Sequence, residues 1–305
     1  MSFDVVVGAG STGVATASLL ADAGHHVRLV TRSGSGPEHP GIERIAADAT
    51  DADRLTALCQ DATSLFTCAA PPYHTWAKAF PPLAAALLTA AERSGAGYVV
   101  LDNLYAYGQV DGPMTEELPS APNSVKGGVR ARIWQEALAA HQAGRVRVTA
   151  VRASDFIGAG ASSVFTLAVA PKVFAGKPAL VPGDLDAPHS WTAVRDVARA
   201  LVTVSRDDRA WGHVWHVPTP APVSVRELAG LLARTAGAPA PKLRAMPGWM
   251  LTLGGLFSPT VRELPEVQYQ FRRPFVLDSS HTEQTFGLKP TPLEVTVQEM
   301  AAAMA

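Results

Sequence analysis

The chain has 305 residues, of which 47% are hydrophobic and 17% are charged. This composition excludes a disordered chain, and the length suits one large α/β unit or two lobes that share an interface. The 26 Lys and Arg residues and the 27 Asp and Glu residues give a net charge of −1. Because the chain lacks a basic excess, we expect no nucleic-acid partner.

The short apolar stretches and the two cysteines limit the cellular compartment that we expect for the protein. The longest apolar runs, 83–91 and 249–257, fall short of the roughly 20 residues that cross a bilayer, so we expect no membrane segment. Residues 1–10 lack the pattern of a secretory signal peptide. Cys59 and Cys68 lack metal-ligand spacing. We therefore expect a cytoplasmic protein with reduced cysteines and without a metal site.

The first half of the chain alternates β-branched runs with Ala- and Leu-rich segments. Apolar strands that are separated by helices favour a parallel sheet with both faces covered. The predicted fold class is therefore α/β, with a doubly wound parallel sheet. Strands are predicted at 3–7, 27–31, 42–46, 64–68, 98–101 and 146–151, and helices at 11–23, 51–60, 75–94 and 125–143.

After residue 150 the elements become shorter, and proline and glycine interrupt them. A helix is predicted at 194–205 and a strand at 213–217. A further helix is predicted at 224–236, where Ser224 and Glu227 form a capping-box pattern. The strand at 214–217 is compatible with a return to the first sheet.

Three glycines follow the first predicted strand, in the run G-A-G-S-T-G at 8–13. In this strand–helix context the spacing indicates dinucleotide binding, whereas an ordinary turn needs only one glycine. Gly8 permits the tight turn, Gly10 lets the backbone approach a pyrophosphate, and Gly13 lets helix and strand pack closely. The free N–H groups at Ser11 and Thr12 favour the anion.

The end of the second predicted strand concerns the choice of nucleotide. An NAD-specific protein usually places a carboxylate here, but this chain has Thr31, Arg32 and Ser33. Because Arg32 can pair with a 2′-phosphate, NADP(H) is predicted over NAD(H). The alternative is that Arg32 is only a solvated side chain at the tip of a loop. Asp48 is placed to meet the adenine edge or to cap the next helix.

Four further motifs occur in a fixed order along the chain. Together with the glycine loop, they resemble the NAD-dependent epimerase/dehydratase family, the extended branch of the short-chain dehydrogenases/reductases. The resemblance covers nearly the whole chain. The motifs are LYAYG at 104–108, VRASDF at 151–156, VRDVA at 194–198 and FGLKPTP at 286–292.

This resemblance implies a Rossmann-like domain and a smaller, mostly C-terminal α+β substrate lobe, with the site in the crevice between them. Ala69 and Ala70 match the small-residue turn that lets the cofactor pass closely in such folds. The expected domains are a dinucleotide-binding domain over 1–152, to which 190–218 returns, and a substrate lobe over 153–189 and 219–305.

The chain departs from this family at its usual catalytic positions. Members commonly end the fifth strand with Ser or Thr, where Asn103 stands here. Lys126 and Arg130 occupy the places of the usual Tyr-x-x-x-Lys pair, and Val7 replaces the first glycine of the usual loop. The resemblance therefore indicates an atypical member.

Reducing a carbonyl requires a hydride at carbon and a proton at oxygen. Arg130 can still hold ribose hydroxyls, but an arginine does not relay protons. One hypothesis makes Lys126 the general acid or a fixed cation at the substrate oxygen, with Asn103 as second donor. The alternatives are that both cations are solvated at a helix start, or bind a phosphate or a partner carboxylate. Tyr105 is the second choice of acid.

Three functions follow from these residues. The leading prediction is an NADP(H)-dependent oxidoreductase that acts on a small organic substrate. The alternatives are an isomerase or lyase that retains its cofactor, and a non-catalytic nucleotide sensor or scaffold. The resemblance also suggests a homodimer through helices 75–94 and 125–143, although their apolar stripes are equally suited to cover the sheet.

Overall fold

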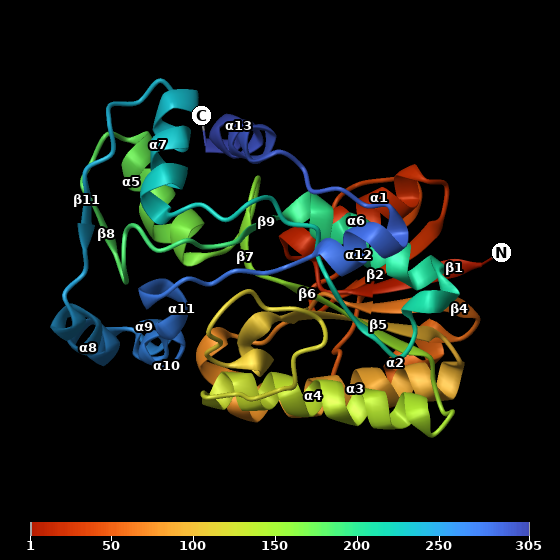
Figure 1. Ribbon diagram of the computed structural model, residues 1–305. Helices are drawn as coiled ribbons and strands as arrows, with labels where there is room; N and C mark the ends of the chain where they lie inside the picture. Colours follow the sequence, from red (N-terminus) through yellow and green to blue (C-terminus); the bar gives the residue numbers. More distant parts are fainter. Residues whose placement is uncertain (1, 305) are drawn as a thin grey trace.

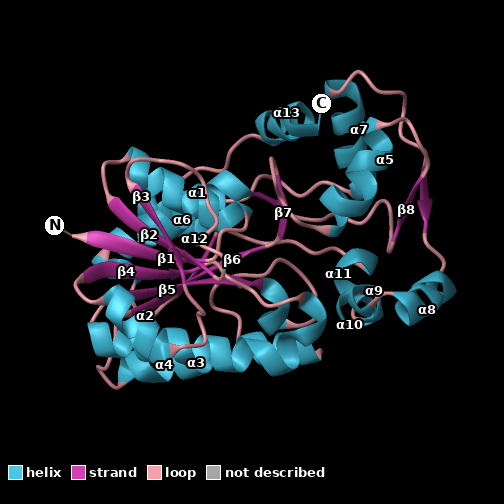
Figure 2. Ribbon diagram, turned by 180° about the vertical axis from the view of Figure 1, so that it is seen from behind, coloured by secondary structure: helices cyan, strands magenta, loops and turns pink. Residues whose placement is uncertain are grey.

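The computed structural model describes residues 2–304, apart from the side chains at positions 252 and 260. Its centre is a seven-stranded sheet with the order β10-β6-β5-β4-β1-β2-β3 (Figures 1 and 2). All neighbouring strands are parallel. The strands are β1 (Phe3–Val7), β2 (His26–Thr31), β3 (Ile42–Ala46), β4 (Ala62–Thr67), β5 (Gly97–Asn103), β6 (Val148–Ala153) and β10 (Val214–His216).

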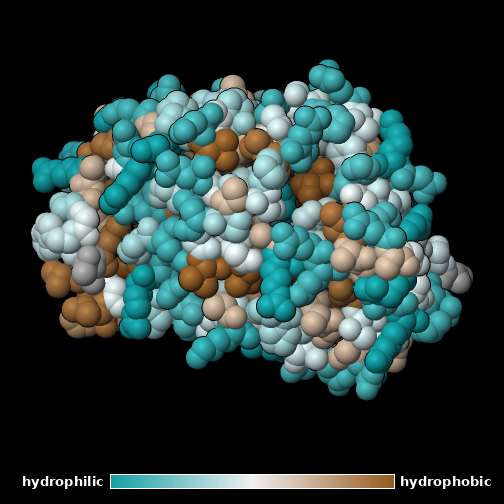
Figure 3. Space-filling model, turned by 60° about the horizontal axis from the view of Figure 1, so that its bottom comes forward, coloured by the Kyte–Doolittle hydropathy of each residue, from teal (hydrophilic) through white to brown (hydrophobic). Residues whose placement is uncertain are grey.

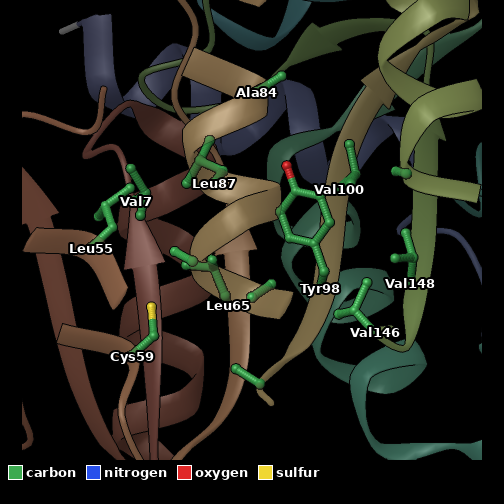
Figure 4. Packing of buried hydrophobic residues seen from close by; sticks show 14 of the residues in the cluster. Val7, Leu55, Cys59, Leu65, Ala84, Leu87, Tyr98, Val100, Val146 and Val148 are labelled. Carbon is green, nitrogen blue, oxygen red and sulfur yellow. The ribbon is translucent and has the colours of Figure 1, made fainter. Parts of the chain in front are cut away.

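Helices cover both faces of this sheet, which confirms the predicted fold class. One face carries α2, α3 and α4, and the other carries α1, α6 and α12 (Figures 1 and 2). The first layer buries Leu55, Leu87 and Tyr98 in one apolar cluster, which Figure 4 shows from close by. The helices are α1 (Ser11–Asp22), α2 (Ala52–Cys59), α3 (Trp76–Ser94), α4 (Val125–Gln142), α6 (Val194–Arg206) and α12 (Ser280–Phe286).

The last strand of the sheet comes from the second half of the chain. Val214, Trp215 and His216 of β10 pair with residues 150–152 of β6. The chain therefore leaves the sheet after β6, builds other elements and then returns. The sheet with α1–α4, α6 and α12 is called the sheet lobe below.

The remaining elements form a second lobe beyond the carboxyl ends of the strands (Figure 1). Two short parallel pairs, β7 with β9 and β8 with β11, pack with helices around a core that includes Phe165, Trp191, Leu228 and Met300. Only Ser154 separates β6 from β7. The elements are β7 (Asp155–Ile157), β8 (Ala179–Val181), β9 (Trp191–Ala193), β11 (Leu243–Ala245), α5 (Ala170–Phe174), α7 (Val225–Thr235), α8 (Gly248–Phe257), α9 (Pro259–Arg262), α10 (Leu264–Val267), α11 (Tyr269–Arg272) and α13 (Leu293–Met304).

The apolar stripes of α3 and α4 face the sheet of their own chain. Trp76, Phe80, Ile133 and Trp134 are each at most 8% exposed. Phe80, Ile133 and Trp134 pack in the apolar cluster on the sheet, as in the alternative to the dimer prediction, and they lend that prediction no support. The homodimer stays a prediction.

Four large apolar side chains on α8 are exposed instead. Trp249, Leu253, Leu256 and Phe257 are between 50% and 88% exposed. Figure 3 shows a brown patch at the left edge of the molecule, where α8 lies in Figure 1. Within residues 2–304, no helix combines the length and the hydropathy that crossing a bilayer requires.

Candidate active site

The glycine loop follows β1 and leads into α1. Gly8 has a φ of +103°, and a Cβ there would lie 2.7 Å from the backbone of Ala69. A Cβ at Gly13 would lie 1.9 Å from the carbonyl oxygen of Gly8, so both positions require glycine for the loop itself. Gly10 differs, because a Cβ there would meet nothing within 4 Å.

The start of α1 has the features of an anion-binding helix end. Gly10 is its N-cap residue, and no side chain caps the first turn. The N–H groups of this turn therefore remain available to a ligand. Thr12 lines the main cavity, and Ser11 lines a second cavity of about 440 Å³ beside Gly158 and Gly160. The loop fits the pyrophosphate of a dinucleotide.

The main cavity, of about 330 Å³, lies where β4, β5 and β6 end and where the second lobe meets the sheet lobe. Ala69 and Ala70 line it on the β4 side, and Asn103 lines it on the β5 side. The Oγ atom of Ser154 is buried and finds no hydrogen-bond partner within residues 2–304. A polar ligand would therefore satisfy an otherwise unpaired group. The lining consists of Thr12, residues 67–71, Tyr73, Trp76, residues 101–105, Arg130, residues 153–156, Ser162, Gln270 and Phe275.

Arg130 belongs to a buried charge network at the wall of this cavity. Its Nε lies 3.3 Å from Asp102 Oδ1, and its Nη1 donates to the carbonyl oxygen of Leu101. Arg152 donates from Nε to Asp102 Oδ2 at 2.9 Å. One buried carboxylate therefore serves two buried guanidinium groups, and Arg130 also stacks over the rings of Trp76 and Phe80. This arrangement fixes Arg130 at the cavity.

Tyr105 contributes a buried phenol to the same cavity. Its hydroxyl lies 3.4 Å from the hydroxyl of Tyr73 and 3.5 Å from Nε2 of Gln270. The Oδ1 atom of Asn103 accepts a hydrogen bond from the backbone N–H of Tyr105 and so fixes the turn that presents this residue. Burial raises the pKa of Tyr105, and the charge of Asp155 raises it further. The phenol is therefore protonated at neutral pH.

Lys126 is placed differently from the sequence-based hypothesis. It is 2% exposed and is not part of the cavity lining. Its Nζ lies 2.5 Å from Glu263 Oε2, donates to Glu266 Oε1 and lies over the ring of Tyr73. Two carboxylates of the second lobe compensate the charge of Lys126. Its environment therefore matches neither the cation at the substrate oxygen nor the solvated cation at a helix start.

An Asp–His pair completes the wall, and the sequence analysis did not assign its Asp155 to the site. Asp155 lines the cavity and lies 2.8 Å from Nε2 of His189, whose Nδ1 lies 3.2 Å from the carbonyl oxygen of Gln270. His189 is buried between the rings of Phe271 and Phe275. Asp155 lies two residues after the end of β6, at the carboxyl edge of the sheet, and this position was a usable signal, whereas nothing in the sequence marks Gln270.

The residues predicted to bind the adenosine half lie away from this cavity, at the ends of β2 and β3. The Thr31 hydroxyl donates a hydrogen bond to the carbonyl oxygen of Ser35, and the Ser33 hydroxyl donates one to Ser35 Oγ. The side chain of Arg32 is exposed. Hydrogen bonds from Thr50 lower the pKa of Asp48, and the charge of Arg32 lowers it slightly more. Asp48 is therefore an ionised carboxylate whose charge interacts with that of Arg32, and it would disfavour a 2′-phosphate there.

Solved structures of several enzymes share this fold over almost their entire length. MoeE5 in complex with UDP-glucuronic acid and NAD has a TM-score of 0.80 at 22% identity, with 99% of this chain and 98% of that chain covered. UDP-glucuronic acid 4-epimerase from Bacillus cereus, in complex with UDP-glucuronic acid and NAD, has a TM-score of 0.80 at 18% identity, with 100% and 99% covered. The Bordetella bronchiseptica enzyme WbmH, in complex with NAD+, has a TM-score of 0.76 at 20% identity, with 99% and 98% covered.

These structures contradict the cofactor prediction. All three are complexes with NAD, whereas the sequence analysis preferred NADP(H). The prediction, which took Arg32 and Ser33 as donors to a 2′-phosphate, was wrong. It placed Asp48 at the adenine edge or at a helix cap and did not weigh the charge of this carboxylate, which interacts with that of Arg32, against a 2′-phosphate.

The comparison with curated proteins finds no match. The sequence profile of the NAD dependent epimerase/dehydratase family matches residues 5–217, which is more than half of the chain. This match agrees with the resemblance that the motifs indicate and with the parallel sheet in the order of a Rossmann fold. The chain therefore belongs to the NAD dependent epimerase/dehydratase family.

Proposed function

We propose that this protein is an NAD-dependent enzyme that oxidises or reduces one carbon of a small organic substrate in the main cavity. The observation that carries the proposal is a single cavity that joins the anion-binding start of α1 to a buried phenol and a fixed guanidinium group. Thr12, Tyr105 and Arg130 all line it. Cofactor and proton donor would therefore meet the substrate in one space.

The cofactor would be held by residues of the sheet lobe. When bound, NAD accepts the hydride that leaves an alcohol carbon, and NADH returns it to a carbonyl carbon. Arg130 would donate hydrogen bonds to ribose hydroxyls, and Asp48 would accept from the adenosine end. The remaining binding residues are Gly8, Gly10, Ser11, Thr12, Gly13, Thr31, Arg32, Ser33, Ala69 and Ala70.

Tyr105 is our choice for the group that moves the proton. In oxidation, the substrate hydroxyl loses its proton to the phenolate oxygen of Tyr105, while its carbon loses the hydride. In reduction, the phenol donates the proton to the carbonyl oxygen. Asn103 positions Tyr105, because its side-chain Oδ1 accepts a hydrogen bond from the backbone N–H of Tyr105. Lys126 is not assigned this role, because Glu263 and Glu266 engage its ammonium group.

The experiment is a survey of turnover followed by near-ultraviolet absorbance. Purified protein is mixed with NAD and a panel of alcohols, and with NADH and the matching aldehydes and ketones. We expect a cofactor-dependent reaction that Tyr105→Phe slows by about 10² to 10⁴. Turnover that survives this substitution would reject Tyr105 as the proton donor. NAD binding without turnover across the panel would favour the non-catalytic alternative.

A second candidate is an isomerase that regenerates its cofactor within each turnover. The fold similarity favours it, because the Bacillus cereus relative is a 4-epimerase and is matched over 99% of its length. The two candidates differ in cofactor balance. Stoichiometric accumulation of NADH with product indicates an oxidoreductase, whereas a changed substrate with no net NADH indicates an isomerase.

A further inference from the structure

The part of the main cavity that faces the second lobe, called the substrate end here, is mainly aromatic. Its lining residues are Tyr73, Trp76, Tyr105, Asp155, Gln270 and Phe275. The ring of Trp76 lies 5.1 Å from the ring of Tyr73 and 6.3 Å from that of Tyr105. The polar groups among them are two hydroxyls, an amide, a carboxylate and the indole N–H of Trp76, which donates to the carbonyl oxygen of Pro71. Such a wall suits an apolar body that carries one or two hydrogen-bonding groups.

The charges at this end do not suit a phosphate. Among the described residues that line the cavity, Arg130 is the only cation, and Asp102 accompanies it. Arg152 shares Asp102 with Arg130, and Lys126 is balanced by two carboxylates. A diphosphate needs unpaired arginines, lysines or backbone N–H groups.

The carboxylate of Asp155 adds to this effect. It lines the cavity and raises the pKa of both Tyr73 and Tyr105, in each case after the larger effect of burial. Both ring nitrogens of His189 face oxygen atoms, so a protonated His189 would at most make the Asp155–His189 pair neutral. The substrate end therefore offers no net positive charge.

Space gives a second, independent limit. The whole cavity measures about 330 Å³, near the lower bound of ligand pockets, and under the proposed function it also holds the reactive end of the cofactor. The segment that carries Glu263 and Glu266 lies beside the cavity, because the Lys126 ammonium group that both carboxylates engage lies over the ring of Tyr73. Glu266 also accepts a hydrogen bond from the backbone N–H of Val125, which ties this segment to α4.

We infer that the substrate is a small uncharged molecule, with an aromatic or aliphatic body and one hydroxyl or carbonyl group, and that nucleoside-diphosphate sugars are excluded. This inference rests on the proposed function and adds the substrate class to it. It separates this chain from the UDP-sugar complexes whose fold it shares.

The test of charge uses benzyl alcohol and benzoate, which have nearly the same size. Binding of each to the NAD-loaded protein is measured by saturation-transfer NMR and calorimetry. We expect benzyl alcohol to bind at least about tenfold more tightly than benzoate. Asp155→Asn and Glu263→Gln should each reduce this ratio by about threefold or more. Glu136→Gln, at an exposed carboxylate of α4, should leave it unchanged.

The test of size uses UDP-glucose on the same NAD-loaded protein. We expect no displacement of benzyl alcohol by UDP-glucose at millimolar concentration. Displacement by UDP-glucose would overturn the inference, and so would a failure of benzyl alcohol to bind or a preference for benzoate. Absence of NAD binding is a different result, because it would remove the proposed function itself.

Discussion

At the scale of single residues, the chemistry depends on the protonation of Tyr105. Burial raises its pKa above the usual value for tyrosine, and Asp155 adds to the rise. The phenol form, which donates a proton, therefore prevails at neutral pH, and the phenolate, which accepts one, is scarce. Reduction should proceed at neutral pH, whereas oxidation should require alkaline conditions.

This difference predicts two pH profiles for the substrate that the survey identifies. In the oxidation direction, kcat should rise by about tenfold per pH unit between about pH 7 and 9. In the reduction direction, kcat should be flat over the same range. Tyr105→Phe should remove the slope in the first profile. A flat oxidation profile in the wild-type protein would contradict the role of the phenol.

Asp102 supports a second prediction at the residue scale. It is 3% exposed and is the carboxylate that two buried guanidinium groups share. Asp102→Asn should lower the free energy of unfolding in urea by about 3–5 kcal/mol, because buried charges lose their partner. Asp53→Asn, which removes an exposed pair with Arg93, should change it by less than about 1 kcal/mol. Equal effects of the two substitutions would show that the buried network contributes little.

At the scale of elements, Lys126 connects α4 to α10 and to Glu263, the N-cap residue of α10. Lys126→Met should loosen this connection and speed proteolysis in 258–272, while kcat falls by less than about tenfold. Arg132→Met provides the control, because its partner Glu136 lies on the same exposed face of α4. Limited proteolysis and steady-state kinetics measure the two effects. A fall in kcat as large as the one expected for Tyr105→Phe would indicate that Lys126 takes part in the reaction.

The predicted elements can be compared with the observed ones to see how far the sequence predicts the fold. The predicted strands and helices of the sheet lobe begin and end within two residues of the observed bounds, and β6 is the one that is shifted by two residues at both ends. The short helix α12 was not predicted. Hydrophobic periodicity and glycine spacing are local signals, so they could be interpreted without the fold.

The surroundings of single charges could not be predicted in this way. Lys126 meets its carboxylates 137 and 140 residues further along the chain, and Asp155 meets His189 after 34 residues. Arg32 was likewise assigned to a 2′-phosphate without Asp48. Long-range pairing decides these environments, and no local pattern encodes it.

At the scale of the whole molecule, His216 links the sheet to the segment before α12. Its Nε2 lies 2.8 Å from the hydroxyl of Tyr107, and its Nδ1 lies 2.7 Å from the carbonyl oxygen of Asp278. Burial lowers the pKa of His216, although the charge of Glu116 opposes the shift. The folded state therefore favours the neutral imidazole.

Stability should consequently depend on pH. The unfolded chain binds a proton at His216 near its usual pKa of about 6.5, and the folded chain binds it only at lower pH. The contribution of His216 is complete above about pH 6.5 and is lost as the pH falls below it. Urea unfolding at several pH values should show this loss in the wild-type protein and in His26→Gln, at an exposed histidine. An unchanged slope in His216→Gln would contradict the assignment.

The account as a whole depends on the glycine loop binding NAD. Gly10 tests this claim without disturbing the fold, because its φ of −69° suits alanine and a Cβ there would meet no protein atom within 4 Å. Calorimetric titration of NAD should show binding to the wild-type protein and to Gly230→Ala, in the middle of α7. Gly10→Ala should raise the Kd for NAD by about tenfold or more, since the new methyl group occupies the path of the pyrophosphate. The free energy of unfolding should be unchanged. Equal affinity of Gly10→Ala and the wild-type protein for NAD would contradict the account.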